Sequence, residues 1–145
     1  MPDGNKAVVP RLIEEGMNNG NARVIEGLVA PNFMAREEEE MRMLGVDGFK
    51  ELLGVYRIAF PDMKLTIEEV IAEGDKVITW ATFTGTHKGP LQTLPATGRP
   101  VKVKDVDLFR VQNGKVVEIR TNFDQWGLMK QLGVIPEGEG EGEER

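Results

Sequence analysis

The 145-residue sequence contains no cysteine, one histidine and one tyrosine, and aromatic residues make up only 6% of it. Without cysteine the chain has no disulfide, no thiol nucleophile and no thiolate metal site, which suits a reducing compartment. Apolar runs of membrane-spanning length are missing, and the first residues lack the basic and apolar regions of a signal peptide. We therefore expect a cytoplasmic protein that does not insert into a membrane.

Basic residues are also in deficit. There are 18 lysines and arginines against 24 aspartates and glutamates, a formal net charge of −6. Nucleic acid binding needs a concentrated basic surface, so the composition argues against that partner. Residues 136–145, PEGEGEGEER, form an acidic low-complexity tail that we expect to be disordered. Residues 1–135 have the length of a single domain.

The periodicity of apolar residues changes along the chain. Helical spacing predicts helices over 5–17, 22–29 and 46–60. Alternation then predicts strands over 65–73, 76–87, 100–112 and 115–123. Short turns join successive strands, so the strands are expected to be antiparallel. Helices followed by such strands predict an α+β domain with a curved sheet wrapped against the helices.

Two surface features follow from the same pattern. Alternate positions put Trp80, Thr82 and Thr84 on the outer face of the strand 76–87, and a partly apolar face of that kind usually marks an interface. The acidic run Glu37–Glu40 is predicted to be a solvated helix end or loop.

Asp124 lies between the last predicted strand and a short apolar helix, with Phe123 and Trp126 beside it. Aromatic neighbours can desolvate a carboxylate, and desolvation raises its pKa toward the range useful for proton transfer. The alternative is that Asp124 caps the helix that follows, as aspartate commonly does. The residues alone leave both interpretations open.

Three further residues are candidates for chemistry. His87 lies where its strand enters the loop 88–99, and imidazole suits either acid–base chemistry or a structural hydrogen bond. Asp105 and Asp107 alternate on one face of a half-apolar strand. They can form a proton-sharing pair, or they can pair with a basic neighbour such as Arg120 across the hairpin.

A series of short motifs carries a family resemblance. They are Phe60–Asp62 (FPD), Ile71–Lys76 (IAEGDK), Thr84–Gly89 (TGTHKG), Leu94–Arg99 (LPATGR), Asp107–Arg110 (DLFR), Gly114–Glu118 (GKVVE) and Asp124–Gly133 (DQWGLMKQLG). In this order they resemble the SnoaL-like polyketide cyclase family, which has the fold of nuclear transport factor two. The resemblance implies a cone-shaped α+β fold, a homodimer or larger homo-oligomer that associates through the outer face of the sheet, and no cofactor or metal.

The resemblance also implies a function. In characterised cyclases an aspartate at the end of the last strand is the general acid/base of an intramolecular aldol ring closure, and Asp124 matches that position. We therefore expect cofactor-independent chemistry on a small apolar carbonyl compound in an enclosed pocket, with Asp124 as acid/base and His87 assisting. The expected pocket residues are Asp105, Asp107, Arg120, Phe123, Trp126 and Phe33.

The chain departs from the family pattern in its last strand. Family members often read Glu-His-Trp-Asp where this chain has Glu118–Thr121 (EIRT), and an early histidine is replaced near Arg36. A binding module that keeps the pocket without catalysis therefore stays open, as does an isomerase, dehydratase or epoxide hydrolase on the same fold. An epoxide hydrolase would need a water held by the two strand aspartates and an arginine, Arg110 or Arg120.

Overall fold

The structure, a computed structural model, describes residues 2–37 and 40–135. Its elements in chain order are α1 (Pro2–Arg11), the π-helical segment η1 (Leu12–Asn18), α2 (Ala22–Leu28), β1 (Val29–Glu37), β2 (Glu40–Met43), α3 (Gly45–Ala59), β3 (Lys64–Glu73), β4 (Lys76–Thr86), β5 (Pro100–Gln112), β6 (Lys115–Phe123) and α4 (Gln125–Gln131). The acidic tail 136–145, whose disorder the sequence predicts, lies outside the described residues. None of the described helices is long and apolar enough to cross a membrane.

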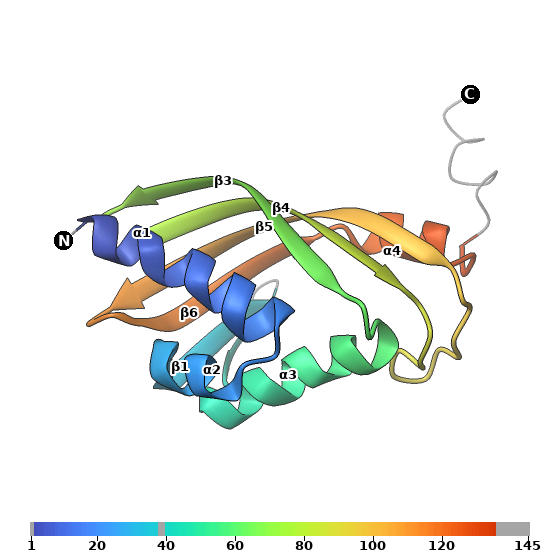
Figure 1. The fold of residues 1–145 in the computed structure, drawn as a ribbon, viewed down its shortest axis with the longest axis horizontal. Coiled ribbons are helices and arrows are strands. Elements are labelled where there is room, and N and C mark those ends of the chain that lie inside the picture. Colours follow the sequence, from blue (N-terminus) through green and yellow to red (C-terminus); the bar gives the residue numbers. More distant parts are fainter. Residues whose placement is uncertain (1, 38–39, 136–145) are drawn as a thin grey trace.

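The strands form one six-stranded sheet in the order β2-β1-β6-β5-β4-β3 (Figure 1). Strands β3 to β6 make an antiparallel meander, as predicted, with short turns between β3 and β4 and between β5 and β6 and the loop 88–99 between β4 and β5. The sheet as a whole is mixed, because β1 pairs in parallel with β6 and antiparallel with β2. The predicted α+β class and the antiparallel pairing of the four predicted strands are confirmed, and the one parallel pairing comes from β1, a strand that the sequence did not predict.

Strands β1 and β2 were absent from the sequence-based prediction. Pro31 lies inside β1 and the segment lacks clean alternation, so the usual strand signal is weak. The acidic run lies at this hairpin: Glu37 ends β1 and pairs in register with Glu40 at the start of β2. Its two central residues lie outside the described part of the chain. The predicted helix end or loop is therefore corrected at Glu37 and Glu40, which belong to strands.

The first predicted helix is divided in two. Pro10 lies in the last turn of α1, and the π-helical segment η1 begins two residues later. Proline removes a backbone donor and crowds the preceding turn, which disfavours a regular α-helix at this point. Val9, Leu12 and Ile13 are nonetheless fully buried, so the segment still presents one apolar face to the core.

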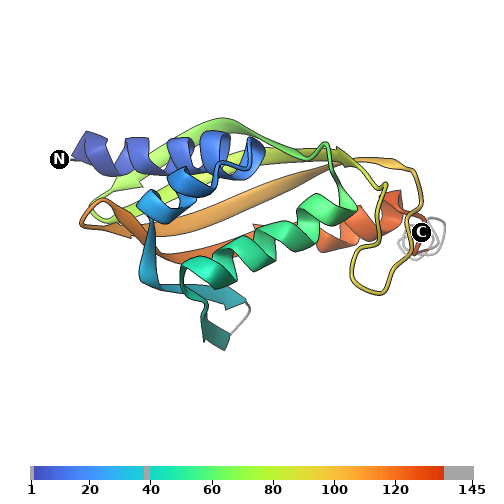
Figure 2. The same ribbon diagram turned by 60° about the horizontal axis from the view of Figure 1, so that its bottom comes forward.

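Helices α1, α2 and α3 lie on one face of the curved sheet, which we call the inner face; the opposite face is the outer face (Figures 1 and 2). The predicted alternation of β4 agrees with burial at its inward positions, from Val77 to Gly85, and the next inward position, His87, is buried just beyond the strand. Helix α3 packs against β1 through a T-shaped contact between Phe33 and Phe49, whose ring centroids are 5.3 Å apart. This packing leaves space between α3 and the central strands.

Candidate functional site

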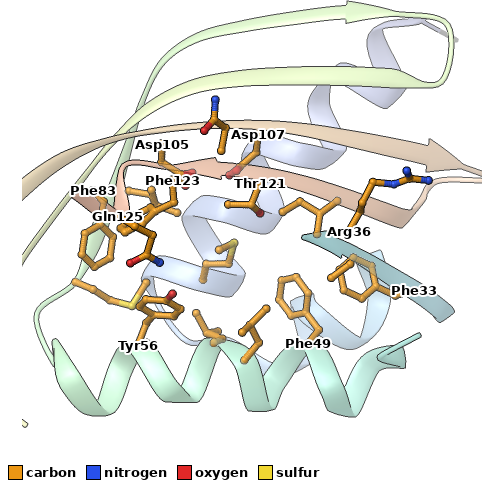
Figure 3. Close-up of a pocket in the computed structure, with 18 of the residues that line it drawn as sticks. Phe33, Arg36, Phe49, Tyr56, Phe83, Asp105, Asp107, Thr121, Phe123 and Gln125 are labelled. Atoms are coloured by element: carbon orange, nitrogen blue, oxygen red, sulfur yellow. The ribbon is translucent and has the colours of Figure 1, made fainter. Parts of the chain in front are cut away.

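A cavity of about 1250 Å³ lies between α3 and the inner face of the sheet (Figure 3). Its wall combines apolar and polar side chains, and its aromatic residues are Phe33, Phe49, Tyr56, Phe83 and Phe123. Tyr56, Phe83 and Phe123 contact one another, with ring centroids between 5.5 and 6.4 Å apart. Such a wall suits an apolar, ring-containing molecule of small size.

Two carboxylates lie in this wall. Asp105 and Asp107 are on the inner face of β5 and are each only 5% exposed. In the β5–β6 ladder Asp105 pairs with Phe123 and Asp107 pairs with Thr121, so all four side chains share the inner face. Figure 3 shows the two aspartates next to each other beside Thr121. The alternation of β5 thus brings two acidic groups into one cavity.

Burial dominates the electrostatics of this pair. The two side chains are hydrogen-bonded to each other, and desolvation raises the pKa of both. The pKa of Asp107 is raised well above its usual range, first by desolvation and then by the charge of Asp105. Hydrogen bonds from the Thr121 hydroxyl and the Asn122 backbone N–H act in the opposite direction. The pair therefore retains a proton at a pH where an exposed aspartate has lost it.

No cation compensates this pair within the described part of the chain. The one basic residue among the described residues of the cavity wall is Arg36, and its Nε lies 3.7 Å from Glu118 Oε2. One oxygen, Oδ1, of each of Asp105 and Asp107 is buried and has no hydrogen-bond partner among the described residues. These two oxygen atoms therefore have acceptor capacity that the described residues leave unused.

Arg120, predicted as a pocket residue and as a partner of the aspartates, lies on the outer face. It pairs across the ladder with Leu108, out of phase with Asp107, and its Nε is 3.0 Å from Glu118 Oε2. Arg110 is on the same outer face, with its Nε 3.4 Å from Glu118 Oε1. The predicted pairing with Arg120 is therefore corrected, and the aspartate–arginine set of an epoxide hydrolase is not brought together.

Asp124 is exposed and caps α4. Its Oδ1 accepts a hydrogen bond of 2.9 Å from the backbone N–H of Gly127. A Cβ at Gly127 would lie 2.3 Å from Asp124 Oδ2, so glycine at that position lets the carboxylate reach the helix end. Neither Asp124 nor Trp126 is among the residues that line the cavity, whereas Phe123 is. Of the two interpretations, the geometry here is that of the helix cap.

His87 is fully buried and belongs to the base of the loop 88–99. Its Nδ1 accepts a 3.1 Å hydrogen bond from the backbone N–H of Thr97, and its ring packs against Phe60 with centroids 5.4 Å apart. Its backbone N–H also donates to the carbonyl of Arg99. Burial lowers the pKa of His87. The residue lies outside the cavity wall and has the contacts of a structural histidine.

Several cavity residues were not singled out from the sequence. Tyr56 lies on the predicted apolar face of α3, and Thr121 alternates with Ile119 and Phe123 on the inner face of β6. Both signals were present in the periodicity, although neither marks chemistry by itself. Among the described residues no group of three or more acidic, histidine or cysteine side chains could hold a metal ion.

A curved mixed sheet that encloses a cavity against N-terminal helices defines an α+β cone of the nuclear transport factor two-like class. Within that class the family model of the SnoaL-like polyketide cyclases matches residues 7–132. The chain belongs to this family.

Individual relatives agree with that assignment. The chain is 29% identical to nogalonic acid methyl ester cyclase of Streptomyces nogalater over 119 residues, 80% of this chain and 88% of the relative. A protein of Jannaschia sp. CCS1, provisionally assigned as a SnoaL-like polyketide cyclase, is 29% identical and has a TM-score of 0.84 over 93% of this chain and 95% of its own. TsrD of Streptomyces laurentii is 28% identical, with a TM-score of 0.78 over 90% of this chain and 98% of its own.

Proposed function

We propose that this chain is a cyclase-type enzyme that performs cofactor-independent acid–base chemistry, of the aldol type, on a small apolar carbonyl compound. The cavity between α3 and the sheet is the proposed substrate site, and the cytoplasm is the proposed location. The observation that carries the proposal is the hydrogen-bonded, uncompensated pair Asp105–Asp107 in the wall of that cavity.

The proposed roles follow from the protonation of the pair. Asp107 has the strongly raised pKa and holds the proton, whereas Asp105 is the partner that ionises first. Ionised Asp105 removes a proton from the carbon next to the carbonyl, the new carbon–carbon bond forms, and Asp107 gives its proton to the resulting alkoxide. The hydrogen bond between the two side chains then returns the proton from Asp105 to Asp107. The cycle consumes no proton overall.

The location of the pair also fits the departure from the family pattern. Family members often have aspartate where this chain has Thr121, and Thr121 lies directly across the β5–β6 ladder from Asp107. Side chains in such cross-strand pairs have Cβ atoms about 4.5–5.5 Å apart, so they reach the same part of a cavity. A carboxylate on β5 can therefore reach the part of the cavity that the β6 aspartate reaches in those relatives.

The test compares three isosteric variants, Asp107→Asn, Asp105→Asn and Asp124→Asn. Nogalonic acid methyl ester, which the name of one relative gives as a substrate, is the first compound to use. Loss of the general acid or base should lower turnover by roughly 10²–10⁴-fold in either variant of the pair, with binding retained in calorimetry. Asp124→Asn should turn over at the parent rate, because asparagine caps a helix about as well as aspartate.

The alternative is a non-catalytic binding protein. It is favoured by Ile119 and Thr121, which stand where family members often have histidine and aspartate. This alternative predicts that the parent protein binds the compound without product formation and without exchange of its α-proton for solvent deuterium. That result would contradict the enzymatic proposal.

A further inference from the structure

A buried threonine on β4 carries a hydroxyl group that no described residue satisfies. Thr79 is 0% exposed, and its Oγ1 has no hydrogen-bond partner in the described part of the chain. A buried hydroxyl without a partner costs free energy, and such groups are uncommon in folded proteins. The neighbouring strand supplies a reason for it.

Strand register places Thr79 opposite Asp107. The β4–β5 ladder pairs Thr79 with Asp107, and the β5–β6 ladder pairs Asp107 with Thr121. Directly opposite side chains have Cβ atoms about 4.5–5.5 Å apart, within reach of a hydrogen bond after a side-chain rotation. Asp107 therefore has a threonine on each side, in what we call the threonine row, Thr79–Asp107–Thr121.

The adjacent row has a different character. Asp105 is flanked by Ala81 on β4 and Phe123 on β6, neither of which has a hydroxyl group. Among the directly paired residues of β4 and β6, hydroxyl donors thus flank Asp107 and not Asp105. One of them, Thr121, already donates to it. The other is Thr79, and the Oδ1 atom of Asp107 that lacks a partner is the acceptor available to it.

We propose that Thr79 is a positioning residue of the aspartate pair, whose hydroxyl donates to Asp107 whenever Asp107 is ionised. This inference rests on the proposed function, because it assigns a new member to the same proton-transfer pair. When Asp107 gives up its proton, two threonine hydroxyls hold the carboxylate from both sides until Asp105 returns a proton. Thr79 does not line the cavity, so it acts through Asp107 and not on the substrate.

Few other charged or titratable groups face this pair. Asp105 lies beside Asp107 on β5, while Tyr56 from α3 and Glu40 from β2 line the same cavity. Arg36 from β1 also lines it, but its Nε lies 3.7 Å from Oε2 of Glu118 on the outer face. The cavity-lining residues of β4 and β6 that the structure describes include none with a titratable side chain. Changes in the titration of the pair can therefore be followed against a small background.

The experiment measures the titration of the aspartate side-chain carboxyl carbons by ¹³C NMR, without substrate. Thr79→Val keeps the shape and removes the hydroxyl, whereas Thr79→Ser keeps the hydroxyl. Loss of one donor to the ionised form should lower the acid dissociation constant of the pair about tenfold in Thr79→Val, with parent behaviour in Thr79→Ser. Asp105→Asn and Asp107→Asn assign the signals.

The matched control is Thr82→Val on the same strand. Thr82 is on the outer face, and its hydroxyl donates to Glu68 Oε2 at 2.5 Å. The proposal is overturned if Thr79→Val titrates like the parent, or if Thr82→Val shifts the pair as much. If Thr79→Val does not fold, Thr79→Ala removes the same hydroxyl. Turnover of the Asp107→Asn variant is measured separately, so failure of the enzymatic proposal is distinguishable from failure of this one.

Discussion

The two faces of the sheet carry buried carboxylates in opposite surroundings. On the outer face Glu118 is 7% exposed and has three arginines, Arg36, Arg110 and Arg120, with Nε atoms within 3.7 Å of its oxygens. On the inner face Asp107 is 5% exposed and has another carboxylate as its neighbour, with no ion pair among the described residues. Burial alone therefore does not mark a reactive acid. The Asp105–Asp107 pair differs from Glu118 in that no basic side chain of the described residues forms an ion pair with it.

The largest expected effect concerns association through the outer face. Ile71, Ile78 and Trp80 are exposed on β3 and β4 and, by register, lie on that face. We predict a homodimer at micromolar concentration in sedimentation experiments, and Trp80→Glu should weaken it by at least roughly 30-fold, or about 2 kcal/mol. Thr82, predicted to contribute to this surface, is buried and bonded to Glu68.

Trp126→Glu is the matched control for association. Trp126 is equally large and is exposed, but it lies on α4 at the end of the sheet (Figure 1). This variant should dimerise like the parent. A monomeric parent protein, or equal weakening by both substitutions, would show that the outer face of the sheet is not the interface.

Removal of the outer charge should destabilise the fold. Glu118→Gln leaves three arginines without their shared carboxylate, and we expect a loss of about 1–2 kcal/mol in the free energy of unfolding. The value lies below that for a fully buried pair, because the arginine side chains are between 33% and 45% exposed. Denaturant unfolding measures it, and Arg120→Gln, which removes one of three cations, should cost less. If Glu118→Gln leaves the free energy of unfolding unchanged, the buried carboxylate of the outer face is not stabilised by its arginines, and the proposed difference between the two faces is wrong.

Removal of the Asp107 charge on the inner face should have the opposite effect on the free energy of unfolding. Because the pKa of Asp107 is raised in the folded protein, the protonated form is favoured by folding, and stability is lost as pH rises through that raised value. Asp107→Asn cannot ionise, so above this window it should be more stable than the parent, by on the order of 1 kcal/mol. Below the pKa of an unfolded aspartate, about 3.9, the two proteins should converge.

Unfolding curves at a series of pH values check this prediction. Asp105→Asn serves as the comparison, because it removes the neighbouring charge and leaves Asp107 in place. If Asp107→Asn is less stable than the parent at every pH, the carboxylate contributes to the fold in a way that the inner-face geometry does not explain.

The smallest expected effect is at Asp124, a carboxylate exposed to solvent. Asp124→Ala removes the cap of α4 and should cost about 1 kcal/mol, whereas Asp124→Asn should cost only a few tenths. Thermal unfolding of both variants gives the comparison. Equal loss in both would mean that the charge of Asp124, and not its capping oxygen, is what stabilises the helix end.

Local patterns predicted much of this fold, and long-range pairing explains what they missed. The strands 100–112 and 115–123 match β5 and β6, because alternation and the Asn113-Gly114 turn are local signals. Strand β1 gave little signal, since its place is set by parallel pairing with a segment some 85 residues later. Such pairing leaves no mark in a short window of sequence.

The candidate site shows the same division. The alternation of Asp105 and Asp107 on one face was visible in the sequence, and so was the capping alternative for Asp124. The partner of the aspartates was mispredicted, because Arg120 and Thr121 are adjacent in sequence and only the register decides which one faces inward. The buried environment of His87 depends on the return of the loop 88–99, which no local pattern specifies.

The threonine row also bears on how the proposed acid–base site can be redesigned. At this row the neighbouring strands β5 and β6 both deliver a side chain to the cavity, so the acid need not belong to β5. In the double variant Asp107→Thr with Thr121→Asp the carboxylate changes strands, while composition, charge and side-chain volume are conserved. If this double variant keeps the proposed acid–base activity, the position of the acid is set by the paired row of the ladder, and either strand can carry it.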